Sequence, residues 1–364
     1  MANIYGKEMK KADILRVAGN IDQIAGIRHE EILDDRARGI KVYNVDNSVL
    51  QYTLTESKAL DVYDFKYKGM GLCFKSKAGL VMPGALDANG WNFHRAQCSG
   101  GLIYSCGFSN VGLFGENPKW HDYDIFHGRI RTIPATNLRA NTYWEGDDYI
   151  LSVAGEMREC ALFKENLAIR REVKTKLGSK SFTFNTEVEN EAFDEAPLMH
   201  MLHINSGFPV VDKDSRLICK VNKTHSMNPV AEANVANFNV MSSPIDNHPE
   251  EVFVHEPYCN EDGICASAIV NDNTKLGIMI KFKVDQFPYL LEWKSMGSGD
   301  YVLGMQPTNC FASGTEYELK KNGKLPMIKP GEIKKFDLEV IVLDGEKDIA
   351  EAEAFINSLS IIKK

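Results

Sequence analysis

Long apolar runs, clustered basic residues and closely paired cysteines are all missing from this chain of 364 residues. No apolar stretch approaches the roughly 20 residues that cross a bilayer, and the N-terminal residues lack the apolar core of a signal peptide. The formal net charge is −8, and lysine and arginine are scattered, whereas nucleic acids and anionic membranes require a concentrated basic face. We therefore expect a cytoplasmic protein that has neither nucleic acid nor a membrane as its partner.

Cysteine spacing excludes two further classes of protein. The eight cysteines include no CxxC pair and no tight cluster, so neither a disulfide scaffold nor a zinc-type site is predicted. In a chain of this length most of them are expected to be small, buried and reduced. Cys106 has a glycine-rich setting, but a nucleophilic role there needs a partnering base that the sequence does not name.

What the chain does contain is strand alternation. Apolar residues make up 44% and charged residues 25% of it, an ordinary balance for a globular protein. From Gly39 onward, short runs with period-two alternation follow one another, as in 167–173 and 182–188 with a glycine-containing turn between them. The runs are too many for an immunoglobulin-sized unit, so we predict a mainly β protein built as a large two-sheet sandwich.

The domain organisation is simple, because no linker, internal repeat or low-complexity tract interrupts the chain. Residues 1–38 are predicted to be an N-terminal extension that packs on the domain and contains a short helical segment. Residues 39–364 are predicted to form one β-sandwich domain. Apolar residues at 3-4-3 spacing from Ile349 to Leu359 predict a helix over 346–361, packed on the outside of a sheet.

One stretch lacks the alternation. Residues 83–135 are rich in Gly, Pro, Asn and Trp and contain His94, His121 and His127. Long irregular segments inside a compact domain are usually functional or disordered, and the aromatic content here favours ordered loops. We predict that this segment builds one wall of a cleft.

A strand that carries two histidines is the centre of the candidate site. Residues 198–209 read Leu-Met-His-Met-Leu-His-Ile-Asn-Ser-Gly-Phe-Pro. Alternation places His203 and Asn205 on one face of this strand and His200 on the other, so the two histidines cannot look into the same cavity. An imidazole and an amide that project together can hydrogen-bond a polyhydroxylated ligand. The alternative is a buried histidine that its neighbours satisfy.

Two further stretches place polar groups where strands begin or end. In His127-Gly128-Arg129 the irregular segment re-enters the sheet, and the glycine allows the backbone to approach a ligand closely. The hydrophobic strand 301–305 ends in Gln306, at a turn. The alternative for the first stretch is an ordinary turn with solvated arginines.

A charged pair marks a third stretch. Glu292 and Lys294 share one face of the strand 289–294, and Trp293 on the opposite face is expected to lie in the core. Such a pair is usually exposed to solvent, so this stretch indicates a binding site only in combination with the others.

In combination, these motifs resemble the aldose 1-epimerase (galactose mutarotase) superfamily, and within it an aldose-1-epimerase-like branch whose members mostly lack an assigned function. The resemblance covers roughly residues 13–345 and implies a large β-supersandwich with a sugar-binding cleft across one sheet. The segments that carry it are His127-Gly-Arg with Pro134-Ala135, His203-Ile-Asn-Ser-Gly-Phe-Pro209, Glu292-Trp-Lys294, Tyr301-Val-Leu-Gly-Met-Gln-Pro307 and the glycine-rich stretch 100–112.

The resemblance also implies roles for particular residues. In galactose mutarotases one histidine protonates the ring oxygen while a glutamate removes the proton of the anomeric hydroxyl, and neither a metal nor an organic cofactor takes part. By motif, His203 corresponds to the acid, His127 to a second histidine that contacts the substrate, and Arg129 to a clamp for a hydroxyl or carboxylate. The position that matches the catalytic glutamate holds Gln306, which cannot act as a base, so Glu292 becomes the candidate base.

The remaining expectations concern substrate binding and its neighbourhood. We expect Asn205, Lys294, Gln306 and Asp61 to hold hydroxyl groups of the ligand. The related branch tends to place an arginine just before the segment Ala59-Leu60-Asp61, where this chain has Ser57-Lys58.

Three functions stay open on this basis. The first is an enzyme that acts on a free sugar or sugar acid by acid/base proton transfer at or near the anomeric carbon. The second is a carbohydrate-binding protein without turnover. The third is a metal-assisted sugar isomerase or lyase that uses His127, His203 and Glu292 as ligands. The first and third require these three side chains to converge in one pocket.

Overall fold

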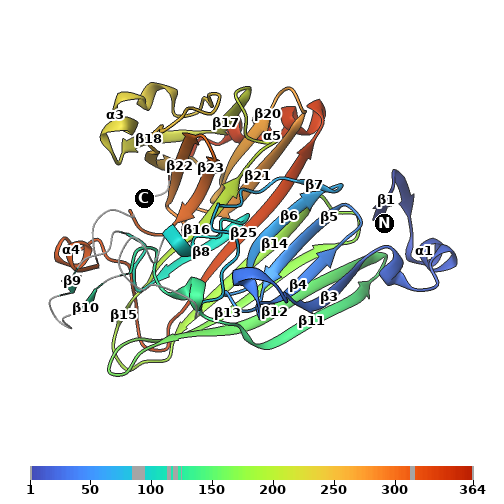
Figure 1. The fold of residues 1–364 in the computed structure, drawn as a ribbon, viewed down its shortest axis with the longest axis horizontal. Helices are drawn as coiled ribbons and strands as arrows, with labels where there is room; N and C mark the ends of the chain where they lie inside the picture. Colours follow the sequence, from blue (N-terminus) through green and yellow to red (C-terminus); the bar gives the residue numbers. More distant parts are fainter. Residues whose placement is uncertain are drawn as a thin grey trace.

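The computed structural model describes residues 2–83, 95–112, 116–117, 122–123, 125–311 and 316–362, and two large antiparallel sheets dominate it (Figure 1). One sheet has eight strands and the other has eleven, counting the short β7 that pairs with β6 beside the main path. A large apolar cluster joins them, with Leu54 and Ile204 from one sheet and Val153 and Phe184 from the other. The predicted mainly β, two-sheet architecture is confirmed.

The eight-stranded sheet runs in the order β11-β12-β13-β14-β25-β21-β20-β17. Its strands are β11 (Thr136–Glu145), β12 (Asp148–Cys160), β13 (Asn166–Lys176), β14 (Ser181–Asn190), β17 (Ser215–Cys219), β20 (Ile264–Asn271), β21 (Leu276–Lys283) and β25 (Ile333–Asp344).

The eleven-stranded sheet runs in the order β18-β19-β22-β23-β16-β8-β6-β5-β4-β3. Its strands are β3 (Gly26–Glu31), β4 (Lys41–Asp46), β5 (Leu50–Thr55), β6 (Asp61–Tyr67), β7 (Met70–Gly71), β8 (Ile103–Phe108), β16 (Met199–Ser206), β18 (Val221–Ser226), β19 (Glu251–Pro257), β22 (Tyr289–Gly297) and β23 (Asp300–Thr308).

Small two-stranded ribbons and short helices complete the described part of the chain. No helix within it has the length and apolarity needed to cross a membrane. The elements are β1 (Ala2–Ile4) with β2 (Lys7–Met9), β9 (Glu116–Asn117) with β10 (Asp122–Tyr123), β15 (Ala196–Pro197) with β24 (Met327–Ile328), the α-helices α1 (Lys11–Val17), α3 (Pro229–Ala233), α4 (Glu316–Lys321) and α5 (Glu346–Ser358), and the 3-10 turns η1 (Ile21–Gln23), η2 (Asp35–Ala37), η3 (Ile130–Thr132) and η4 (Val235–Asn237).

The predicted hairpin of β13 and β14 shows how alternation determines these strands. Leu167, Ile169 and Val173 are buried in the core between the sheets, as is Arg171 on the same face, while the alternate residues lie on the other face. The turn requires Gly178, because its φ is +76° and a Cβ there would lie 2.4 Å from the backbone oxygen of Asn3. Sequence periodicity and turn chemistry therefore agree in this part of the sheet.

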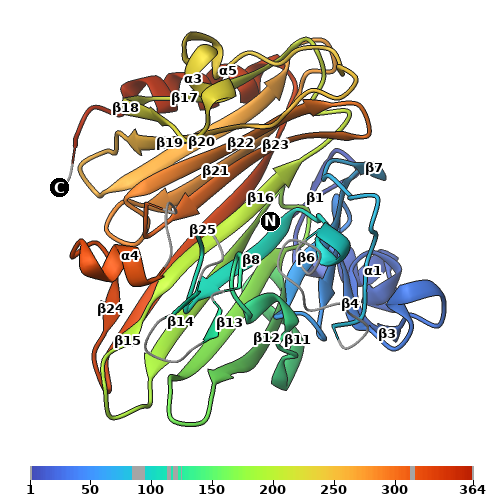
Figure 2. The same cartoon turned by 60° about the vertical axis from the view of Figure 1, so that its left-hand side comes forward.

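Both ends of the chain join the sandwich. Helix α5 buries Ile349, Ala352 and Ile356 against the outer surface of the eight-stranded sheet (Figure 2), which confirms the predicted C-terminal helix. At the other end, β3 pairs with β4 as the edge strand of the larger sheet. The sheet therefore begins inside the predicted extension 1–38, and its edge does not coincide with the expected boundary at residue 39.

Candidate functional site

A row of side chains crosses the outer face of the eleven-stranded sheet, meaning the face turned away from the eight-stranded sheet. Strand β16 lies between β8 and β23 (Figures 1 and 2), with His203 opposite Tyr104 and Asn205 opposite Gly304. Gly304 is in turn opposite Trp293 on β22. Because paired residues share a face of a sheet, these side chains lie together, as strand alternation predicts for His203 and Asn205.

Three rings surround the imidazole of His203. The centroid distances are 5.3 Å to Trp293, 5.6 Å to His127 and 6.3 Å to Tyr104, and each pair is arranged edge to face. The side chains leave His203 only 9% exposed. The two histidines, distant in sequence, therefore lie side by side in an aromatic setting.

Hydrogen bonds determine the tautomer of His203. Its Nδ1 lies 2.5 Å from Oδ1 of Asn205, and an amide oxygen only accepts, so Nδ1 donates. The amide itself is oriented by its Nδ2, which donates to the backbone oxygens of Gly101 and His203 at 3.0 and 3.1 Å. Burial lowers the pKa of His203 to about 4, although the bond to Asn205 acts in the opposite direction. At neutral pH the ring is therefore uncharged, and its Nε2 carries a lone pair.

His127 is positioned by its own backbone. It has a φ of +63°, and Gly128 follows with a φ of +71°. A Cβ on Gly128 would lie 2.0 Å from the backbone oxygen of Gly107, so glycine is required at this point. Nδ1 of His127 donates to the backbone oxygen of Val111 at 2.9 Å. Much of the predicted cleft wall, with His94 and His121, lies outside the described residues.

Gln306 lies on the same outer face, two residues along β23 from Gly304. Its side chain is completely buried, and neither its oxygen nor its nitrogen has a hydrogen-bond partner among the described residues. The amide occupies the space that a side chain at position 304 would take, since a Cβ there would lie 2.5 Å from Nε2 of Gln306. A buried amide without partners is costly, and its place beside Asn205 and Trp293 makes it a candidate ligand-binding group.

Arg131 and Tyr104 add a cation and a phenol to the site. Arg131, in η3, is 1% exposed, and its Nη1 donates to the hydroxyl of Tyr104 at 2.8 Å. Sequence reasoning missed Tyr104, and it missed Trp293 as a site residue. It named Arg131 in the His127 motif only as a cation that permits an anionic substrate, with a solvated turn as the alternative. Tyr104 is recognisable only once β8 is known to pair with β16.

Glu292 lies on the opposite face of the same sheet. On β22 it is opposite Met305, which is opposite Ile204, and both of these face the core between the sheets. Glu292 is 1% exposed, its Oε2 lies 3.0 Å from Nε2 of His255, and burial raises its pKa. The carboxylate is therefore part of a buried polar pair inside the sandwich.

This placement corrects two predictions. The expected convergence of Glu292 with His127 and His203 is wrong, because the sheet separates the carboxylate from the imidazoles. The two faces of β22 are also the reverse of those predicted, since Trp293 faces the site and its charged neighbours are buried. Both faces of this strand are covered, so the sequence pattern did not distinguish them.

The same arrangement removes the predicted ligand set for a metal ion. Within the described part of the chain, no three or more His, Cys, Asp or Glu side chains are grouped so that they could hold one. The cysteines all lie in the described part and are free thiols. Burial raises the pKa of the Cys106 thiol well above its usual value, which is the opposite of what a nucleophile needs.

The side chain of Lys294 lies on the same inner face of the sheet as that of Glu292. It is 2% exposed, and its Nζ donates to the backbone oxygen of Asn237 at 3.0 Å and lies 3.5 Å from Oε2 of Glu251. It does not reach the row around His203, so its predicted role in substrate binding is wrong.

Arg129 and Asp61 bind other parts of the protein. Arg129 forms an ion pair with Glu165, and its Nη2 lies 3.7 Å from Oε1 of Glu159. Asp61 accepts hydrogen bonds from the backbone nitrogen and the hydroxyl of Ser105, at 2.9 and 2.5 Å, and lies 3.3 Å from Nη1 of Arg171. Their charges are thus compensated within the protein.

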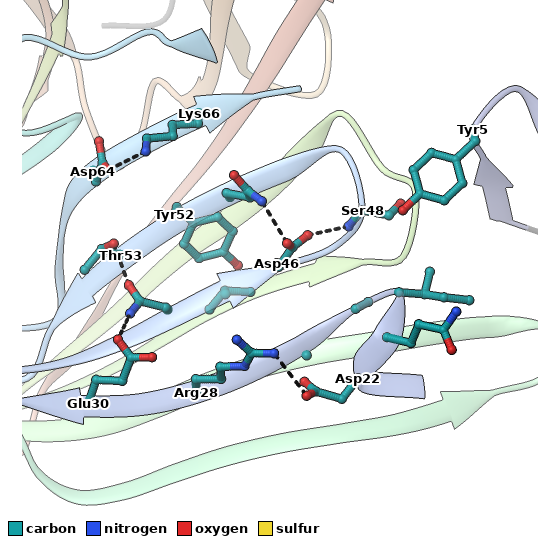
Figure 3. Close-up of a pocket in the computed structure, with 17 residues that line it drawn as sticks. Tyr5, Asp22, Arg28, Glu30, Asp46, Ser48, Tyr52, Thr53, Asp64 and Lys66 are labelled. Carbon is teal, nitrogen blue, oxygen red and sulfur yellow. Dashed lines mark hydrogen bonds and ion pairs between the residues drawn. The ribbon is translucent and has the colours of Figure 1, made fainter. Parts of the chain in front are cut away.

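A hollow lies apart from this row, over β3 to β6 on the same outer face, with a volume of about 450 Å³ (Figure 3). Several of its polar groups are bonded to one another: Nδ2 of Asn44 donates to Glu30 at 2.7 Å, Thr53 donates to Asn44 at 2.7 Å, and Nη2 of Arg28 donates to Asp22 at 3.2 Å. The hydroxyls of Ser48 and Tyr52, which also line the hollow, have no hydrogen-bond partner among the described residues. In Gln306 both a donor and an acceptor lack a partner, so we take its amide as the stronger indication of a ligand.

Solved structures share the whole sandwich. A protein from Klebsiella pneumoniae, provisionally named an aldose 1-epimerase, matches with a TM-score of 0.87 at 21% identity, over 94% of this chain and 92% of that one. A galactose mutarotase-like protein from Clostridium acetobutylicum gives 0.62 at 16% identity, over 88% and 99%. A galactose 1-epimerase from Lactobacillus acidophilus gives 0.58 at 9% identity, over 88% and 100%. The chain therefore has the galactose mutarotase-like fold.

Sequence comparison identifies the family. Among curated proteins nothing matches the chain. The family model described as "Domain of unknown function (DUF4432)" matches residues 37–342, a range that contains every residue of the row around His203. Because this match spans most of the sequence, the chain belongs to the DUF4432 family.

Proposed function

We propose that the outer-face site binds a free sugar or sugar acid, and that the protein is an aldose 1-epimerase-like isomerase that transfers protons at or near the anomeric carbon. Proteins of the same fold that carry such names support this kind of activity. The observation that carries the proposal is the buried, unpartnered amide of Gln306 beside the uncharged ring of His203. A sugar hydroxyl both donates and accepts hydrogen bonds, so it satisfies both atoms of the amide.

His203 would act as the base in this reaction. With Nδ1 donating to Asn205, its Nε2 can accept the proton of the anomeric hydroxyl. This role differs from the acid role that the resemblance implies. It follows from the tautomer and from the lowered pKa of His203, and it supplies the base that position 306 lacks.

Tyr104 is the corresponding acid. Its hydroxyl oxygen accepts from Arg131, which leaves its own proton available to the ring oxygen of the sugar. Burial raises the pKa of Tyr104 well above its usual value, so the phenol remains protonated until it reacts. Arg131 would stabilise the phenolate formed in the step.

In the proposed reaction every proton that one group releases is taken up by another. The hydroxyl proton on C1 moves to Nε2 of His203, the bond between C1 and the ring oxygen breaks, and the ring oxygen takes the proton of Tyr104. Rotation about the bond between C1 and C2 presents the other face of the aldehyde. The reverse transfers then close the ring and restore both side chains.

The test is the rate of anomer exchange, followed by NMR or polarimetry on freshly dissolved sugars and sugar acids. We expect His203→Ala to lower the rate by roughly 10²- to 10⁴-fold. The matched control is His29→Ala, a histidine on β3 whose side chain is 46% exposed and pairs with Glu56, for which we expect an unchanged rate. Equal rates in the two variants would remove His203 from the reaction.

A carbohydrate-binding protein without turnover is the second candidate. The observation that favours it is the amide at position 306, which the resemblance matches to the catalytic glutamate of galactose mutarotases and which cannot act as a base. Calorimetry that shows sugar binding, together with no acceleration of anomer exchange by the same preparation, would establish this function instead.

A further inference from the structure

A buried lysine borders the site on the side of Tyr104. Lys58 lies in the turn between β5 and β6, where Ala59 and Leu60 both have left-handed backbone conformations, with φ of +55° and +57°. Its side chain is 3% exposed. Among the described residues we find no hydrogen bond or ion pair of its amine. A buried ammonium group without a close partner is costly, so its position calls for an explanation.

The charged groups around Lys58 do not provide one. The nearby carboxylate of Asp61 already accepts from Ser105 and pairs with Arg171 from the opposite sheet. Arg131 brings a second positive charge to the same place. Burial lowers the pKa of Lys58 to about 8, with Asp61 and Cys98 acting against this effect and Arg131 adding to it. At pH 7 the amine is still mostly charged.

A small cavity lies beside this lysine and is bordered by Tyr104, a member of the row around His203. It has a volume of about 10 Å³ and is lined by Lys58, Asp61 and Tyr104, among others. That is close to the lower limit for a single water molecule. Tyr104 belongs to both places, because its ring packs against His203 while its hydroxyl contacts Arg131. Lys58 therefore adjoins the row around His203 through Tyr104.

We propose that Lys58, together with Arg131, binds the carboxylate of a sugar acid whose anomeric end lies at His203 and Gln306. This assignment rests on the function proposed above and narrows its substrate class to carboxylated sugars. A carboxylate fits better than a phosphate because the cavity has room for about one oxygen atom. A charge-assisted hydrogen bond also gives the buried ammonium group the partner that it lacks.

Calorimetry on the full-length protein with matched ligand pairs tests the proposal. The pairs are D-galacturonate with D-galactose and D-glucuronate with D-glucose, and D-galactose 6-phosphate tests the other anion. We expect at least one of the two uronates to bind about tenfold or more tightly than its neutral counterpart. This is the effect of one hydrogen bond to a charged group. In Lys58→Met that preference should disappear while the affinity for the neutral sugar is retained. Lys58→Arg should keep the preference.

The outcomes are distinct. Equal binding of the uronate and the aldose in both pairs by the unmodified protein would overturn the carboxylate site and leave the proposed function intact. Tighter binding of the sugar phosphate than of either uronate would also overturn it. If no sugar or sugar acid binds, the proposed function fails and the carboxylate site fails with it. These comparisons use the unmodified chain, so they hold even if a Lys58 variant does not fold.

Discussion

The buried side chain of Gln306 lowers the stability of the folded protein, because its amide has no hydrogen-bond partner among the described residues. An amide inside a protein normally has partners, and leaving a buried donor or acceptor unsatisfied costs about 1–3 kcal/mol. Here both amide atoms lack partners among the described residues, and the missing side chain of Gly304 is what makes room for them. Such a local loss of stability is typical of a binding site, where a ligand supplies the missing hydrogen bonds.

The substitution Gln306→Leu follows directly from this argument. It removes the unsatisfied atoms and keeps the volume, so we expect the free energy of unfolding to stay level or to rise by about 1–3 kcal/mol. The affinity for the sugar should fall by about tenfold, because the ligand loses its partner. Denaturant unfolding and calorimetry measure the two effects.

A matched control separates binding from folding. Gln286 has the same side chain, but its Nε2 donates to Asp337 at 2.8 Å and its Oε1 accepts from the backbone nitrogen of Asp337 at 2.7 Å. Gln286→Leu should therefore lower stability and leave the sugar affinity unchanged. If both leucine variants lose stability alike, or if Gln306→Leu binds sugar normally, position 306 has no special role.

The role of His203 is also decided at the scale of single atoms. Strand alternation in the sequence placed His203 and Asn205 on one face, and the structure agrees. Which nitrogen carries the proton depends on the orientation of the Asn205 amide, which the backbone oxygen of Gly101 helps to determine. Gly101 is far away in sequence, so no local pattern could have distinguished a base from an acid.

Among the elements, β16 and β22 show what a sequence pattern can and cannot predict. The sequence predicted which residues share a face of β16, because His203 and Asn205 are two residues apart in a strand that ends at a turn. The faces of β22 were not predictable, because both of them are largely buried and neither is marked as a solvent face by its residues. In addition, the pairing of β8 with β16 joins segments that are far apart. The strands and the two-sheet architecture could thus be predicted, whereas half of the site could not.

The position of Glu292 on β22 leads to a prediction about stability. Its pairing with His255 is buried on both sides, with side chains that are 1% and 0% exposed. Removing one partner of a buried pair typically costs about 3–5 kcal/mol, so Glu292→Ala should lower the free energy of unfolding by about that much. The rate of anomer exchange per folded molecule should not change, because the sheet lies between this carboxylate and His203.

A surface pair provides the control for Glu292. Glu256 contacts His225 at 3.0 Å on the two strands at one edge of the sheet, where the side chains are 35% and 25% exposed, and ion pairs that reach solvent contribute little. Glu256→Ala should therefore change stability only slightly. A strong loss of anomer exchange in folded Glu292→Ala would restore the carboxylate to the reaction and contradict the arrangement of faces described for β22.

For the molecule as a whole, the two histidines of β16 link stability to pH. His200 faces the core between the sheets, where it contacts Phe108, Phe287 and Phe336, and His203 faces the site. Burial lowers the pKa of His200 to about 3 and that of His203 to about 4. Both rings are therefore uncharged in the folded protein under conditions in which an unfolded histidine already binds a proton.

The sign of the effect follows from proton binding. Between about pH 6.5, where a histidine titrates in the unfolded chain, and the pKa of about 4 of His203 in the folded protein, the unfolded state binds more protons. Stability is then fully present above about pH 6.5 and decreases as the pH falls toward 4. Glu292 and Asp61, whose pKa values are raised by burial, act in the opposite direction, so the total slope alone is not diagnostic.

The variant His200→Phe isolates one of these protons. Phenylalanine suits the aromatic surroundings of this position and cannot be protonated, although it gives up the bond from Nδ1 to the backbone oxygen of Cys106 at 3.1 Å. We expect the slope of unfolding free energy against pH, measured by denaturant titration between pH 4.5 and 6, to be smaller than in the unmodified protein by up to about 1.4 kcal/mol per pH unit, the value for one proton. Identical slopes in the two proteins would mean that His200 binds its proton equally well in both states. Its burial among the phenylalanines would then have no part in the loss of stability in acid.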